Sequence, residues 1–338
     1  MKDINLANFS KFRNQKQQGY INVSGTNIKL PITIICGKKE GKTALITGGV
    51  HCAEYVGIET AIELSKEINP EDISGNIIIV PLINRSGFEN RTMSVVYEDG
   101  KNLNRVFPGN EQGSVSEKIA YFMEKELFKI SDYYIDLHCG DGYEELTPYV
   151  YYQGVASEDV TSKSKQMAMA INPKYVVESQ SNSGGAYNYA GSIGLPGILI
   201  ERGCMGKWSK EEVEEYKIDV KNVLKELNVL SGEKVDRNNN TKVITNTIYE
   251  NSMYTGCWYS NYKVGDIVSK GDELGIVKDY FGNILHTCIA KVDGIILYQV
   301  GSLSILKDGQ AVFTNLEKCY IYRYVFAKGT ESENKIKV

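Results

Sequence analysis

The segment GGVHCAEY at residues 48–55 contains residue types that could build a metal site. His51 and Glu54 stand three positions apart, directly after an apolar run that predicts a strand, so both side chains should point toward one spot. Zinc accepts imidazole nitrogen and carboxylate oxygen at about 2.0–2.2 Å, and a catalytic zinc ion keeps three protein ligands and one water molecule. A third protein ligand is therefore required.

The chain contains three histidines, and His138 ends a second predicted strand, in the segment DLHCG. Two imidazoles and a carboxylate at the ends of strands of one sheet could converge on one ion without distortion. We therefore predict one zinc ion per subunit, held by His51, Glu54 and His138 in an open hydrolytic site. The alternative for any single histidine is a core or surface position without ligand function, and the isolated His286 fits that alternative.

Zinc chemistry also requires a base that takes a proton from water and passes it to the leaving nitrogen. Glu201, in GILIERGC, ends another predicted strand and is the natural candidate, although a surface ion pair with Arg202 is an equally good interpretation. Asp136, two residues before His138, is a candidate acceptor for the hydrogen of a ligating imidazole. It could equally be an ordinary acid at a strand end.

The segment EDGKNLNRVFPG at 98–109 lies between the ligands and predicts a loop rich in Gly and Asn. The guanidinium of Arg105 can bind a carboxylate through two parallel hydrogen bonds, and Asn104 can add an amide donor. We predict that both residues bind a substrate carboxylate. A structural loop with a solvated arginine is the competing interpretation.

Apolar strand-like runs alternate with helical periodicity up to about residue 230, which predicts an α/β layered sheet with its ligand site at the carboxyl ends of the strands. A helix is expected over 117–130 and a longer one over 209–230. The polar segment GEKVDRNNNTK at 232–242 suggests a boundary between a hydrolase domain, 1–234, and a β-sandwich or barrel domain, 235–338.

Composition restricts the partners of the chain. The net charge of −4 gives no electrostatic attraction to nucleic acid or to an anionic membrane, so a small molecule is the expected partner. The N-terminus lacks the apolar core of a signal peptide, and no stretch is apolar enough to span a bilayer, which predicts a cytoplasmic protein. Seven scattered cysteines are expected to be reduced thiols.

Together with NRSGF at 84–88 and ILIERG at 198–203, the segments quoted above resemble the succinylglutamate desuccinylase/aspartoacylase branch of the zinc carboxypeptidase-like hydrolases of the M14 type. The resemblance covers most of residues 40–205. It implies a carboxypeptidase-like mixed sheet flanked by helices, followed by a smaller all-β domain that narrows access to the site. It also implies one zinc ion and cleavage of an amide or acyl bond in a small molecule such as an N-acylated amino acid.

Carried over by position, His51, Glu54 and His138 match the zinc ligands of that family, Glu201 its base, and Asn104 with Arg105 its substrate-carboxylate pair. Family members also polarise the scissile carbonyl with an arginine that precedes this loop, for which Arg91 is the nearest candidate. Cys52 and Cys139, which directly follow the two histidines, are departures from the pattern of many relatives.

The sequence thus predicts a zinc-dependent amidohydrolase that deacylates a small N-acyl substrate. Two alternatives stay open: a metallocarboxypeptidase acting on peptides, and a non-enzymatic protein that binds metal or ligand. The acyl group, the amine and the formation of a homo-oligomer are not encoded in these motifs.

Overall fold

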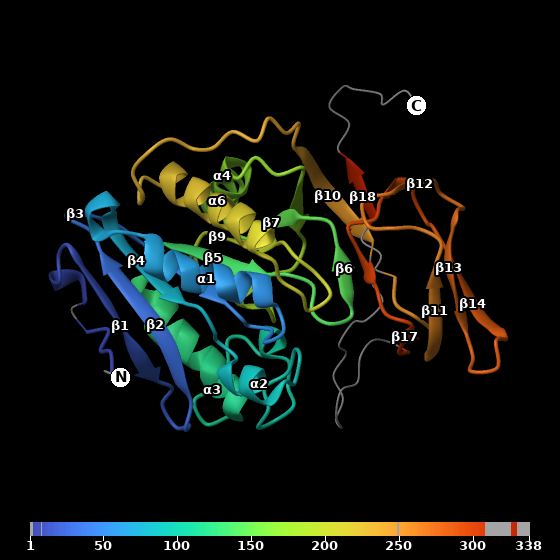
Figure 1. The fold of residues 1–338 in the computed structure, drawn as a ribbon, viewed down its shortest axis with the longest axis horizontal. Coiled ribbons are helices and arrows are strands. Elements are labelled where there is room, and N and C mark those ends of the chain that lie inside the picture. Colours follow the sequence, from blue (N-terminus) through green and yellow to red (C-terminus); the bar gives the residue numbers. More distant parts are fainter. Residues whose placement is uncertain (1–2, 8, 249, 308–325, 330–338) are drawn as a thin grey trace.

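A ten-stranded mixed sheet forms the centre of the molecule (Figure 1). The computed structural model describes residues 3–7, 9–248, 250–307 and 326–329. The strands of the sheet are β1 (Gln15–Asn22), β2 (Lys29–Cys36), β3 (Lys39–Gly48), β4 (Ser74–Val80), β5 (Tyr133–His138), β7 (Tyr149–Gln153), β8 (Tyr175–Ser179), β9 (Gly197–Glu201), β10 (Lys242–Ile248) and β18 (Phe326–Gly329).

The strand order is β1-β2-β4-β3-β5-β9-β7-β8-β10-β18. Its central strands β4, β3, β5 and β9 run parallel, whereas β7 is antiparallel to β9 and β1 and β2 form an antiparallel edge. The carboxyl ends of β3, β5 and β9 consequently lie next to one another. Parallel strands expose such an edge to ligands because their connections return on the faces of the sheet.

Helices cover both faces of the sheet (Figure 1). One face packs against α1 (Tyr55–Glu67), α4 (Glu158–Ala170) and α6 (Lys210–Glu226), and the other against α3 (Val115–Phe122) and α5 (Ala186–Ser192). Val and Ile dominate the central strands, where residues such as Ile46, Ile79 and Ile135 are fully buried. Burial on both faces explains why these strands are continuous apolar runs rather than alternating ones.

After residue 234 the chain first adds β10 to the large sheet, parallel to β8, and then forms small antiparallel sheets. Four short strands make the larger of these: β11 (Gly256–Ser260), β13 (Glu273–Lys278), β14 (Ile284–Ile289) and β17 (Ser304–Ile305). β12 (Ile267–Val268) pairs with β15 (Gly294–Ile295), and β16 (Tyr298–Val300) pairs with β6 (Glu144–Leu146) of the first half. The domain boundary at 234/235 stays a prediction.

The expected class, an α/β mixed sheet flanked by helices with a smaller C-terminal all-β part, is confirmed. One difference concerns the helix expected over 117–130, which starts as α3 and continues as a π turn, Met123–Leu127, and a 3-10 turn, Phe128–Ile130. Among the described residues, no helix is long and apolar enough to cross a bilayer. The six described cysteines are free thiols, and Cys319 lies outside the described residues.

Candidate active site

The segment that follows β3 delivers the first two candidate ligands. Gly49 adopts a φ of +63°, and a side chain there would meet Leu82 Cδ1 at 2.7 Å, so glycine is favoured where the chain turns away from the strand. His51 and Glu54 follow in the turn, and α1 begins at the next residue, Tyr55. The turn therefore holds both side chains above the carboxyl end of β3.

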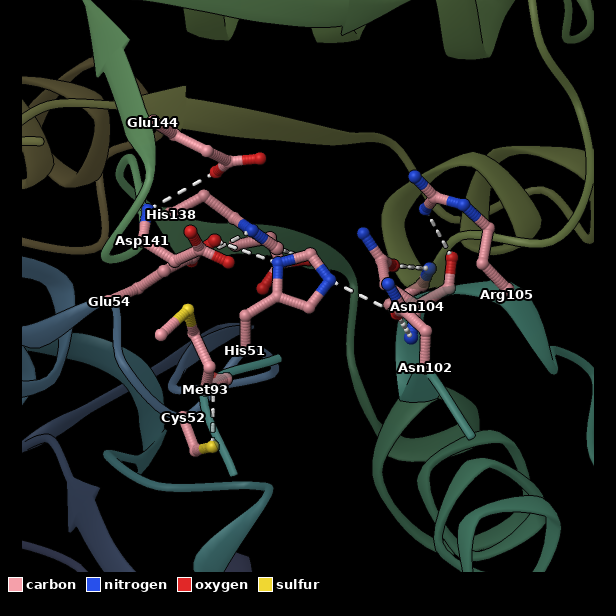
Figure 2. A network of polar contacts seen from close by, with 12 residues as sticks. His51, Cys52, Glu54, Met93, Asn102, Asn104, Arg105, His138, Asp141 and Glu144 are labelled. Carbon is pink, nitrogen blue, oxygen red and sulfur yellow. Dashed lines mark hydrogen bonds and ion pairs between the residues drawn. The ribbon is translucent and has the colours of Figure 1, made fainter. Parts of the chain in front are cut away.

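The three candidate metal ligands come together (Figure 2). His51 Nδ1 lies 2.7 Å from Glu54 Oε1, and His138 Nδ1, at the end of β5, lies 3.0 Å from Glu54 Oε2. One nitrogen or oxygen atom from each residue lies within 4.8 Å of the other two. Two imidazole nitrogens and a carboxylate are the donors that zinc accepts in catalytic sites.

Oxygen acceptors hold the other nitrogen of each imidazole. Asn102 Oδ1 lies 3.1 Å from His51 Nε2, and Asp136 Oδ2 lies 3.2 Å from His138 Nε2. Thr47 donates to the second oxygen of Asp136 at 2.7 Å, so that this carboxylate is itself fixed. An acceptor at Nε2 can take the hydrogen of a neutral imidazole, which would leave the lone pair of each ring on Nδ1, the atom that faces Glu54.

Burial and charge at the same point suit a cation. Glu54 is 2% exposed. Its Oε2 accepts no hydrogen bond from the part of the chain that the structure describes. His138 Nδ1 lies at ion-pair distance from this oxygen but without hydrogen-bond geometry. Burial alone would raise the pKa of Glu54, but the two histidines hold it below its ordinary value. Burial alone would lower the pKa of His138, but Glu54 and Asp136 raise it well above its ordinary value. An orphaned buried oxygen between two imidazoles fits a bound metal ion.

Glu201 ends β9, beside β5, in register with His138. Burial raises the pKa of this carboxyl group well above its ordinary value; the charge of His138 opposes the rise, and Glu54 adds to it. Arg202 pairs with Asp219 at 2.7 Å, on the side of helix α6, rather than with Glu201. Glu201 lines the same cleft as the three candidate ligands, so the structure brings it to the place where a base would act.

The loop residues Asn104 and Arg105 also line the cleft. They belong to the short 3-10 turn Leu103–Arg105, and Asn104 Oδ1 accepts a hydrogen bond from Ala186 N at 2.8 Å, which ties the loop to the start of α5. Arg91, by contrast, is exposed at the C-terminus of α2 (Arg85–Asn90), with a φ of +55°, and is not among the residues that line the cleft. Arg105 is the one arginine or lysine among those lining residues.

The cleft has a volume of about 500 Å³ and contains several residues that motif analysis did not select. Asp141 and Glu144 lie on the His138 side of it (Figure 2), where burial, with the charge of Glu144 adding to it, raises the pKa of Asp141 to about 8. Tyr298, from the C-terminal part, donates to Glu144 at 2.5 Å. Other polar and aromatic lining residues are Tyr149, Tyr151, Ser179, Tyr187 and Asn188.

Among the cleft residues that were not predicted from the sequence, Asn102 could have been found, because it belongs to the same Asn-rich segment as Asn104. The remaining lining residues come from strands and loops whose convergence depends on the tertiary fold. The two cysteines beside the ligands are buried, and Cys52 donates to Met93 O at 2.9 Å (Figure 2). Burial raises the pKa of the Cys52 thiol to about 11, so it is protonated at neutral pH.

A second group of acids, Glu63, Glu67 and Glu214, also comes within metal-binding distance on the surface between α1 and α6. Lys217 forms ion pairs with all three carboxylates. The ammonium group of Lys217 compensates the charge of these carboxylates, so their proximity needs no metal ion.

A parallel sheet edge at which catalytic residue types come together in a cleft is typical of α/β enzymes. The family model for the succinylglutamate desuccinylase/aspartoacylase catalytic domain matches residues 40–227, more than half of the chain, and the chain belongs to this family of deacylases. The resemblance stated from the motifs is confirmed.

One characterised relative is the N-alpha-acetyl-L-2,4-diaminobutyric acid deacetylase of Halomonas elongata, which is 36% identical over 152 residues. That match spans 44% of this chain and 43% of the relative. Among solved structures, the product-bound ectoine utilization protein EutE (DoeB) of Ruegeria pomeroyi superposes with a TM-score of 0.81 at 25% identity, over 93% of this chain and 96% of that one. A succinylglutamate desuccinylase/aspartoacylase from Rhodobacter sphaeroides gives a TM-score of 0.79 at 23% identity, over 94% and 97%.

Proposed function

We propose that this chain is a zinc-dependent hydrolase that cleaves the amide bond of a small N-acyl substrate bearing a carboxylate, such as an N-acyl amino acid. The observation that carries the proposal is the convergence of the Nδ1 atoms of His51 and His138 on the carboxylate of Glu54 in the lining of a cleft. The family and the deacetylase relative support amide hydrolysis as the reaction.

Each end of the substrate has a partner in the cleft. Arg105 is the one arginine or lysine that lines the cleft and is proposed to bind the carboxylate, and Asn104 stands beside it on the same turn. A carboxylate anchored there leaves the acyl-nitrogen bond to extend toward His51 and Glu201. Anchoring of this kind orients the bond for attack and contributes to catalysis by removing the freedom of the substrate to move.

Zinc held by His51, Glu54 and His138 would supply Lewis acidity and bring the pKa of a water molecule near 7. Glu201 accepts the proton of the attacking water and then gives it to the leaving nitrogen, so that the amine departs neutral. Burial raises the pKa of this carboxyl group, which favours its uptake of a proton from water.

The test is a screen of N-acetyl and N-succinyl amino acids with zinc-loaded protein, followed by the Glu201→Gln variant. We expect at least one N-acyl amino acid to be hydrolysed and the Gln variant to lose roughly 10²-fold or more in kcat while keeping its zinc. Glu158→Gln is the control, because Glu158 is an exposed acid in the first turn of α4 and lies outside the cleft lining.

Wild-type turnover by Glu201→Gln would show that another group is the base. Activity on peptides with none on N-acyl amino acids would favour the metallocarboxypeptidase alternative. Zinc binding without turnover of either class would favour a binding protein.

A further inference from the structure

We propose that Tyr216, on helix α6, is a positioning residue that holds the proposed base and one proposed metal ligand at a fixed spacing. Its hydroxyl group donates to Ile200 O at 2.6 Å and lies 3.0 Å from His138 O. The side chain is fully buried. One hydroxyl group therefore contacts the backbone of both strands, β5 and β9, at the point where they end.

The two carbonyl groups belong to the peptide units that aim the functional side chains. Ile200 directly precedes Glu201, and the other carbonyl is that of His138 itself. Arg202 N also donates to His138 O, at 3.2 Å, so the last rung of the β5–β9 ladder and the tyrosine share this acceptor. Beyond these residues both strands leave the sheet, and one further backbone hydrogen bond, from Gly140 N to Gly203 O at 2.9 Å, joins the segments that follow. The hydroxyl of Tyr216 adds a side-chain restraint at the end of both strands.

Helix α6 also holds the residue on the other side of Glu201. Arg202 donates to Asp219 at 2.7 Å, and Arg237 pairs with the other oxygen of Asp219 at 2.8 Å. Asp219 is 1% exposed and lies three residues after Tyr216, on the same face of the helix. Residues 200–202 are thus fixed at the carbonyl before the base and at the side chain after it.

Loss of the hydroxyl group leaves two buried carbonyl oxygens with fewer donors, and the ends of β5 and β9 are expected to shift to recover them. A shift of about an ångström is large for a base and a ligand that must face one point. The role of Tyr216 in catalysis rests on the proposed function, whereas its role in metal binding can be tested without any substrate.

The experiment compares Tyr216→Phe with Tyr152→Phe in the full-length protein. Tyr152, in strand β7, is the control because its side chain is also buried and donates to Glu178, and neither tyrosine lines the cleft. For Tyr216→Phe we expect kcat to fall about 10-fold with KM within about twofold, and the zinc Kd, measured by chelator competition, to rise about 10-fold. Tyr152→Phe should lose as much thermal stability as Tyr216→Phe but keep kcat and zinc Kd within about twofold of the wild-type values.

Equal kcat and zinc Kd for the two variants would overturn the proposal and reduce Tyr216 to a structural role. A second variant, Arg202→Lys, keeps the charge opposite Asp219 but changes its geometry, and should lower kcat about fivefold with zinc Kd unchanged. An unchanged kcat in Arg202→Lys would contradict the claim that the ion pair of Arg202 with Asp219 on α6 helps to position Glu201. If the wild-type protein hydrolyses no N-acyl substrate, the proposed function fails, and the comparison of zinc Kd still decides the role of Tyr216.

Discussion

At the scale of single residues, the proposed site depends on which nitrogen of each imidazole is free. Asn102 and Asp136 both stand at Nε2, so both rings present Nδ1 toward Glu54. The two acceptors differ in charge and in origin, one an amide in a loop and the other a buried carboxylate in β5. Both can hold the hydrogen of a neutral imidazole at Nε2, which would leave the two Nδ1 atoms for a common metal ion.

This arrangement predicts that Asn102→Ala weakens zinc binding about 10-fold or more, because the ring of His51 loses the acceptor that orients it. Asn102→Asp retains an oxygen at that position and should keep affinity close to wild type. Zinc Kd from chelator competition measures both. Asn110→Ala is the control, since its side chain accepts from Gln112 N at 2.9 Å in the turn that follows this loop and does not line the cleft. Equal affinities for the Ala and Asp variants of Asn102 would mean that the loop, and not the acceptor, matters.

The sequence allowed the ligand set and the base to be predicted because each of those residues directly follows or ends an apolar run. Their convergence in the cleft agrees with that reasoning, although only mutagenesis tests their roles. Asp141, Glu144 and Tyr298 could not be selected in the same way. Each is an ordinary residue in its local segment. Asp141 reaches the cleft in the loop after β5, whereas Glu144 and Tyr298 belong to the paired strands β6 and β16, and local patterns do not encode that pairing.

At the scale of elements, the start of helix α3 holds the loop that carries Asn102 and Arg105. Glu117 accepts hydrogen bonds from the backbone and hydroxyl of Ser114, at 2.9 and 2.8 Å, and pairs with Lys101 at 3.0 Å. Ser116 donates twice to Asp99, at the start of the same loop. The helix terminus and the loop are therefore stabilised together.

The hydrogen bonds from Ser114, with the ion pair to Lys101, lower the pKa of Glu117 to about 2. The pKa of a glutamate in the unfolded chain is near 4.3. The ionised Glu117 therefore stabilises the fold above about pH 4.3, and this contribution is lost as the pH falls toward 2. Glu117→Gln should therefore reduce the free energy of unfolding by roughly 0.5–1 kcal/mol at pH 7, on the usual scale of helix-terminus interactions. The difference from wild type should narrow between pH 5 and pH 3.

Urea unfolding across that pH range measures the effect. The control is Glu126→Gln, an exposed acid just beyond α3 in the same helical stretch, which removes a charge without touching the cap. A destabilisation by Glu117→Gln that stays constant down to pH 3 would show that lost packing, and not the ionised cap, is responsible.

Some helices and strands could be predicted from the sequence and others could not. The central strands and α1 and α6 could be recognised because buried parallel strands are continuous apolar runs and both helices have clear periodicity. Strand β1, QKQQGYIN, escaped recognition because it lies at the edge of the sheet and is largely polar. Helix α4 escaped because its exposed face is rich in Ser, Lys and Asp, which weakens the apolar signal.

At the scale of the whole molecule, the cleft is closed by both halves of the chain. β16 pairs with β6, Gln299 donates to Glu145 at 2.8 Å, and Tyr298 enters the cleft lining. Strand β10, which follows the polar segment at 232–242, joins the sheet of the first half. A composition change could mark where the architecture alters, but not that the later part of the chain would return to the large sheet.

The central claim is that one divalent ion belongs between the two imidazoles and Glu54. Its most direct test is the zinc content, by elemental analysis, of wild-type protein and of His138→Ala after loading and dialysis, with Glu201→Gln as a control that keeps all three ligands. The account predicts one zinc ion per chain in the wild type and in Glu201→Gln, and a loss of most of it in His138→Ala. Zinc retained equally by His138→Ala, or absent from the loaded wild type, would contradict it.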